Sequence, residues 1–244
     1  MAKQEPNDRK AVIDSIRKQR NTSEKRQGLL IVAVAGVIAI GLIGAVAWKP
    51  VSDAMDRRQA RATALADIGA PADSCGEITK KDAQGEQDHV PEGTDLTYPD
   101  APPAFGQHWD IWDTMERQLY TASDRPELGE LVHNLEHGYT LVWYDETAAD
   151  DAEMMADIRA LAAKFDDETD YRNKAKMVPW TSKDGEAFPE GKHIALTHWS
   201  AGRGLEPSGK QEGVWQFCSA PSGAALETFM EQFPYMDSPE PDAV

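Results

Sequence analysis

Two histidines that lie four residues apart are the side chains of this sequence best suited to hold a metal ion. His133 and His137 occur in the segment LVHNLEHGYTLVWY, with Glu136 between them. On a helix, residues with this spacing lie one turn apart on the same face, so both imidazoles could reach one ion. Imidazole nitrogens bind zinc and copper(II). His89 and His108, which precede this segment, are the candidates for the remaining ligands.

The same pattern has two other interpretations. It can be the solvated polar face of an ordinary helix, where a histidine in the last turn interacts favourably with the helix dipole. The order His-x-x-Glu-His also occurs in a class of metalloproteases, in which the glutamate is the general base. Glu136 is therefore the candidate base of a metallohydrolase, although the sequence contains no complete catalytic set and predicts no cofactor-binding motif.

A helix that would position these histidines is indicated between residues 124 and 138. Asp124 is placed as its N-cap, Glu127 completes a capping-box pattern, and Gly138 is placed to end it. His133 and His137 lie on the side opposite the apolar stripe, so we expect them to face solvent, the preceding loop or a binding site. The stripe consists of Leu128, Leu131, Val132 and Leu135.

The remaining elements predict a small mixed sheet covered by helices, in an α/β or α+β fold. They are a buried strand at 139–144, a helix at 147–165, an edge strand at 176–180, a strand at 193–199, a glycine-rich loop at 201–213 and a final helix capped by Ser222. This order suits a thioredoxin-like or a ferredoxin-like sheet, although no Cys-x-x-Cys motif is present. The proline-rich segment 70–110 is predicted to be a long, ordered loop because it is rich in aromatic and histidine residues.

Residues 28–48 form an uncharged apolar run that predicts a single transmembrane helix. Its 21 residues would extend about 30 Å as a helix, which matches the hydrocarbon core of a bilayer. Residues 1–27 contain eight Lys/Arg and four Asp/Glu, and basic flanks remain in the cytoplasm. We therefore expect a cytoplasmic N-terminus and an extracytoplasmic C-terminal domain. The alternative is a cleaved signal peptide, since residues 45–47 read Ala-Val-Ala.

The predicted organisation thus has five parts. They are a basic cytoplasmic tail (1–27), the transmembrane helix (28–48), a stalk helix (49–69), an extracytoplasmic globular domain (70–236) and a flexible acidic tail (237–244). Cys75 and Cys218 both fall on the outer side, where thiols are oxidised, so we expect a disulfide between them. Two buried thiols or a copper site that includes cysteine are the alternatives.

The formal net charge of −17 limits the partners of the chain. A phosphate backbone repels a surface of this sign, so nucleic acid is not an expected partner. An acidic surface suits a basic protein partner, a divalent cation, or solubility alone.

The motifs HV-(x)7-YPDAPPAFGQHWDIW and LVHNLEHGYTLVWY resemble an uncharacterised family of actinobacterial and other bacterial proteins, the domain of unknown function 3105. The resemblance extends over residues 70–233 and is densest between His89 and Tyr144. It implies a membrane segment followed by a domain outside the cell, names no activity, and places all four histidines within one set of motifs. The segment TMERQLYTAS departs from the family pattern, in which a cysteine often occurs at this point.

Three functions are consistent with these features. The leading expectation is a non-enzymatic accessory or interaction subunit of an actinobacterial membrane complex, attached to the membrane by residues 28–48. The first alternative is an extracytoplasmic protein that binds copper or zinc through His89, His108, His133 and His137. The second is a metallohydrolase with Glu136 as its base.

Overall fold

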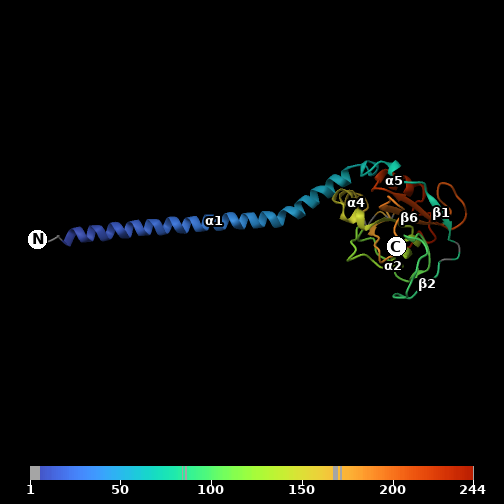
Figure 1. Ribbon diagram of the computed structural model, residues 1–244, viewed down its shortest axis with the longest axis horizontal. Coiled ribbons are helices and arrows are strands. Elements are labelled where there is room, and N and C mark those ends of the chain that lie inside the picture. The colour runs from blue at the N-terminus through green and yellow to red at the C-terminus, as the bar shows by residue number, and fades with distance from the viewer. Residues whose placement is uncertain (1–5, 84, 86, 167–169, 171, 244) are drawn as a thin grey trace. The chain divides into compact units, whose positions relative to one another are not determined.

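The computed structural model of the chain describes residues 6–83, 85, 87–166, 170 and 172–243, and it divides into two units, residues 1–55 and 56–244 (Figure 1). The described residues of the first unit, 6–55, all belong to the helix α1, Pro6–Ala62, which contains Pro50; the last turns of this helix, residues 56–62, are assigned to the second unit. Within the described part of the chain, no helix is both long and apolar enough to cross a membrane. Of the predicted span 28–48, the side chains of residues 28, 39–41 and 43–47 lie outside the described residues.

The described residues of the second unit form a five-stranded mixed sheet in the order β1-β7-β6-β4-β5. Its strands are β1 (Thr79–Asp82), β4 (Thr140–Tyr144), β5 (Ala175–Pro179), β6 (Ile194–Ser200) and β7 (Glu212–Cys218). The β4–β5 pair is parallel, and the other three pairs are antiparallel. The prediction of a small mixed sheet covered by helices is therefore confirmed, including the position of the proline-containing strand at an edge.

Helices cover both faces of this sheet. They are α2 (Leu128–Glu136), α3 (Glu146–Asp150), α4 (Ala152–Lys164) and α5 (Gly223–Gln232). In Figure 1, α4 and α5 lie on one side of β6, and α2 lies on the other. Short 3-10 turns at Leu65–Asp67 and Ala72–Ser74 lead from α1 into the sheet, and α5 contacts both of them.

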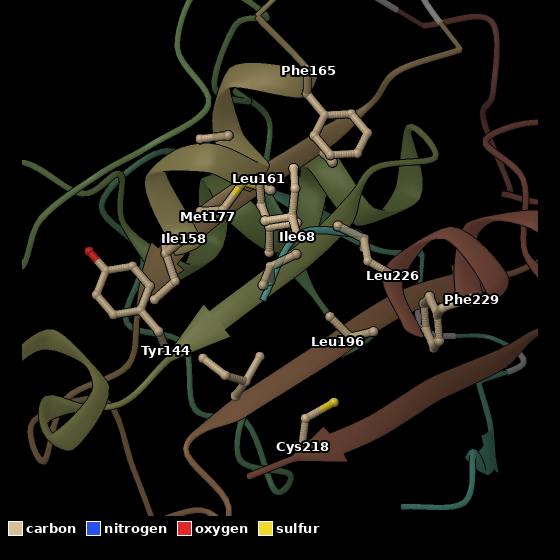
Figure 2. Packing of buried hydrophobic residues seen from close by; sticks show 14 of the residues in the cluster. Ile68, Tyr144, Ile158, Leu161, Phe165, Met177, Leu196, Cys218, Leu226 and Phe229 are labelled. Carbon is tan, nitrogen blue, oxygen red and sulfur yellow. The ribbon is translucent and has the colours of Figure 1, made fainter. Parts of the chain in front are cut away.

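Two apolar cores result, one on each face. Side chains alternate along β4, so Val142 contributes to the core under α4 and α5, whereas Leu141 and Trp143 contribute to the core under α2. Figure 2 shows the first core, in which Ile158 and Leu161 of α4 and side chains of α5 lie over the sheet. The second core holds α2 against the sheet and so supports the face that carries the histidines.

The helix α2 starts at a different residue from the predicted one but ends at the predicted glycine. Glu127, not Asp124, is the N-cap, and it forms a capping box with Glu130. Asp124 instead closes a turn, because its carboxylate accepts the backbone N–H of Thr121 at 2.7 Å. Gly138 ends the helix with φ +87°, a conformation that other residues rarely adopt, and a Cβ there would collide with the carbonyl of Tyr235.

Three other expectations differ from the structure. The helix predicted at 147–165 is divided at Asp151, whose carboxylate caps α4 by accepting the N–H groups of residues 153 and 154. The predicted loop 201–213 ends inside β7. The long loop 70–110 contains β1 and a small parallel pair, β2 (His89–Val90) with β3 (His108–Trp109).

The acidic C-terminal tail, predicted to be flexible, packs against the domain. Asp237 and Ser238 are buried, at 1% and 0% exposure. The Asp237 carboxylate accepts the hydroxyl of Ser200 at 2.7 Å, and the backbone N–H of Glu240 donates to the carbonyl of Glu136 at 2.9 Å. Polar groups of the tail are thus paired inside the fold, which composition alone does not indicate.

Cys75 and Cys218 lie at disulfide distance, with their sulfurs 2.00 Å apart. This pairing was predicted. It connects the start of the long loop to the end of β7 across 143 positions of sequence.

Candidate metal centre

Two backbone features bring distant histidines together. The register of the β2–β3 pair places His89 opposite His108. β3 then packs on α2, where Gly129 permits the close approach, since a Cβ at this position would lie 2.7 Å from the ring of Trp109. The imidazole of His133, one turn further along α2, therefore lies beside the histidines of the two short strands.

Four donor atoms converge at this point, and in the described residues they form the group His89, His108, His133 and Glu136, all within 4.8 Å of one another. The Nε2 atoms of His89 and His133 are 3.4 Å apart. Oε2 of Glu136 lies 2.8 Å from Nε2 of His108 and 3.4 Å from Nε2 of His89. The set is three imidazole nitrogens and one carboxylate oxygen.

Backbone carbonyls orient two of the imidazoles so that Nε2 faces the group. Nδ1 of His108 lies 2.8 Å from the carbonyl oxygen of Gly106, and Nδ1 of His133 lies 2.7 Å from that of Trp109. A carbonyl only accepts hydrogen bonds, so each Nδ1 carries a proton, and in the neutral imidazole Nε2 is then the nitrogen that has a free lone pair. Metal-binding histidines almost always donate their second N–H in this way.

The group is largely removed from water. The side chains of His108 and Glu136 are 0% exposed, whereas that of His89 is 39% exposed. Nε2 of His108 and Oε2 of Glu136 are buried, yet neither has a well-aligned hydrogen-bond partner among the described residues, despite their short separation. A buried carboxylate needs a compensating partner, and a cation between these two atoms would satisfy both.

The protonation states favour a cation as that partner. Burial lowers the pKa of His133 to about 4, and repulsion from His108 and His89 adds to the effect. Burial raises the pKa of Glu136, but the proximity of His108, the hydrogen bond from Gln87 and the charge interaction with His89 outweigh it, so that the pKa lies below its usual value. Near neutral pH, His133 is therefore a neutral donor and Glu136 is an anion, as metal binding requires.

The spacing of the donors suits an ion of the size of zinc. Zinc bonds of about 2.0–2.1 Å in a tetrahedron place neighbouring donors about 3.3–3.4 Å apart. Two of the separations, His89 to His133 and His89 to Glu136, are 3.4 Å. The separation between His108 and Glu136, at 2.8 Å, would widen by a few tenths of an ångström.

His137, predicted to share an ion with His133, belongs to a second group beside the first. Its ring lies 4.3 Å from that of His133 and 4.9 Å from that of Trp112, measured between centroids. In the described residues its donor atoms are grouped with Glu136 and Glu240. Burial and repulsion from His133 lower the pKa of His137 to about 3.

Two residues of these groups were not predicted as ligands. Glu136 was considered only as a catalytic base, although its position between the two histidines in sequence was a signal of proximity. Glu240 lies in the segment predicted to be a flexible tail, and no sequence signal connects it to the histidines.

Buried side chains hold the loop that lies over the site. Asn134 of α2 donates to the carbonyl of Asp113 at 2.7 Å, and Nζ of Lys176 lies 2.6 Å from the Asp113 carboxylate. Lys176 also donates to the carbonyl of Arg117 at 2.9 Å. These contacts hold residues 113–117, which follow directly on the segment whose carbonyls, those of Trp109 and Ile111, orient His133.

A family model described as a protein of unknown function (DUF3105) matches residues 89–243 of the chain. The match starts at His89 and includes Glu240, so both groups of donors lie within it. No curated protein matches the chain, and no solved structure does. Because the matched residues make up well over half of the sequence, the chain belongs to the DUF3105 family of proteins of unknown function.

Proposed function

We propose that this protein binds a divalent transition-metal ion, preferably zinc, through His89, His108, His133 and Glu136. The observation that carries this proposal is the convergence of three Nε2 atoms and one carboxylate oxygen in a buried site, where His108 and Glu136 have donor atoms without aligned hydrogen bonds. The half-exposed His89 gives the ion a path from solvent.

The donor set favours zinc over other common ions. Three imidazoles exclude magnesium and calcium, which take oxygen ligands. Zinc accepts a tetrahedral set of nitrogen and oxygen donors, whereas copper(II) prefers a tetragonal arrangement. Copper is the alternative ion, because it binds imidazole more tightly at equal geometry.

The role of Glu136 distinguishes binding from hydrolysis. In a metallohydrolase the base activates a water molecule that occupies an open metal position. Here the carboxylate of Glu136 lies among the histidine nitrogens, in the position of a ligand, and is fully buried. This arrangement supports a protein that holds its metal rather than one that hydrolyses a substrate.

We propose further that residues 28–48 attach the protein to the membrane with the N-terminus in the cytoplasm. The acidic domain outside would then serve as an accessory subunit of a membrane complex, and its partner would be a basic protein. The uncharged run, the basic segment before it and the net charge of −17 support this arrangement.

We also propose that the sheet is of the thioredoxin-like type. The unit β4–α4–β5 is followed by β6–β7–α5, with no strand after α5 among the described residues. A ferredoxin-like chain needs a strand there.

Elemental analysis of the full-length chain, purified in mild detergent and passed over a chelating resin, tests the metal proposal. Wild-type protein is expected to retain zinc, and the His108→Ala/His133→Ala variant is expected to lose it. His193→Ala is the matched control, because His193 pairs with Asp145 at 2.9 Å and belongs to neither group of donors. Equal metal content in all three proteins, or none in the wild type, would refute the proposal. Copper in place of zinc in the wild type would support the metal site and identify copper as its ion.

A further inference from the structure

We infer a second cation position beside the first, formed by Glu136, His137 and Glu240, so that two ions share the Glu136 carboxylate. The inference rests on the proposed function, because the first ion supplies the neighbour with which Glu136 is shared. The position would take a divalent transition-metal ion such as zinc, with water in its remaining coordination sites.

The donors of this position are close together and one of them lacks a partner. One donor atom from each of the three residues lies within 4.8 Å of the others. Nε2 of His137 is 3.8 Å from Oε2 of Glu240. The His137 side chain is only 2% exposed, and its Nδ1 has no hydrogen bond among the described residues. His137 is thus a buried imidazole whose Nε2 lies near a carboxylate and whose Nδ1 is unpaired, and such a polar group calls for a partner.

Glu136 has the capacity to serve both ions. An ionised carboxylate offers about four lone-pair sites on its two oxygens. Oε1 accepts one hydrogen bond, from the amide of Gln87 at 3.0 Å, and Oε2 faces His108 and His89. Ions that share a carboxylate in proteins lie about 3.5–4 Å apart, and the His133 and His137 rings, 4.3 Å apart, are spaced suitably for such neighbours.

The C-terminal segment is held so that Glu240 reaches the end of α2. The backbone N–H of Glu240 donates to the carbonyl of Glu136 at 2.9 Å. Nζ of Lys174 donates to the carbonyls of His137, Pro241 and Ala243 at 2.8, 3.0 and 2.9 Å. Lys174 thus connects the segment to the residue that supplies the imidazole.

The second position should bind its ion more weakly than the first. It has three protein ligands instead of four, and the Glu240 side chain is 49% exposed, so solvent competes for the ion. The buried ammonium of Lys174, which contacts the His137 carbonyl, also repels a cation. The two ions should therefore bind in two separable steps.

Zinc titration of the full-length, metal-depleted chain by calorimetry, with stoichiometry checked by elemental analysis after equilibrium dialysis, tests the inference. Wild-type protein is expected to bind two ions. Glu240→Gln and His137→Ala should each keep the first ion and weaken the second by more than about 10-fold, since loss of a ligand should exceed the effect of losing an outer partner. Glu231→Gln, a change at an exposed helical residue, is the control and should bind two ions.

The outcomes separate the two proposals. A wild type that binds one ion, with Glu240→Gln unchanged, overturns the second position and leaves the proposed function intact. A wild type that binds none overturns the proposed function and this inference with it. Glu240→Gln keeps the test valid even where His137→Ala fails to fold, because the Glu240 side chain is half exposed.

Discussion

Removal of the Gln87 side chain should weaken zinc binding without unfolding the protein. The Gln87 amide donates to Oε1 of Glu136 at 3.0 Å, and its own oxygen accepts the amide of Gln211 at 2.7 Å. Gln87 is thus an outer partner that orients the carboxylate ligand while it does not contact the ion. Loss of such a partner typically costs about 10–100-fold in metal affinity, which corresponds to about 1.4–2.7 kcal/mol.

The expected change has a direct physical cause in the structure. Without Gln87, the hydrogen bond that helps to lower the pKa of Glu136 against the effect of burial is lost. The carboxylate then holds a proton more readily and is free to rotate away from His108. Both effects reduce its value as a ligand near neutral pH.

Competition with a chromophoric zinc chelator measures this effect on the first binding step. We expect Gln87→Ala to raise the dissociation constant by about 10–100-fold. Gln216→Ala is the matched control, because the Gln216 amide donates to the carbonyl of Gly76 at 3.0 Å and has no contact with the donor group. If Gln87→Ala binds zinc within twofold of the wild type, Glu136 is not held as a ligand in the way the geometry indicates.

Three other changes test the surrounding fold. Lys176→Met should lower the free energy of unfolding by up to about 3 kcal/mol, because it leaves the Asp113 carboxylate, which is only 17% exposed, without its cation; urea denaturation measures this, and Asp113→Asn in the same chain should recover part of the loss. Leu131→Ala should cost about 2–5 kcal/mol in the same assay, since Leu131 is 0% exposed, whereas Leu205→Ala, at 71% exposure, should change little. Burial lowers the pKa of His198, so as the pH falls this histidine takes up a proton in the unfolded chain before it does so in the folded chain. The melting temperature of the metal-free protein should therefore fall as the pH drops below about 6.5, and it should fall less in His198→Gln.

Elements with strong local signals were predictable from the sequence. The run of β-branched and aromatic residues in β4 indicated a buried strand, Pro179 indicated an edge, and Ser222 capped the last helix as expected. β1 was missed because all four residues of TKKD are exposed, and lysines on an edge strand leave no apolar pattern. β7 was missed because glycine and glutamine interrupt its apolar residues.

The candidate site was predictable only in its local part. The spacing of His133 and His137 correctly placed them on one side of α2, away from the apolar stripe. It could not show which of them faces β3, because that depends on where a distant strand crosses the helix. Gly129, which lets Trp109 approach closely, directs that crossing toward His133, and His137 is left to the C-terminal segment.

The position of Glu136 is difficult to explain without a cation. A fully buried carboxylate destabilises a fold unless it is paired, and replacement of such groups by apolar side chains is often neutral or stabilising. Among the described residues, Glu136 has the imidazoles of His89 and His108 on one side, His137 on the other, and the Gln87 amide as an aligned donor to its oxygens. The lowered pKa of His133 means that this imidazole does not supply the missing positive charge near neutral pH. An ion bound between Glu136 and the histidines would supply it, which is why we assign the anion to metal binding rather than to stability of the empty fold.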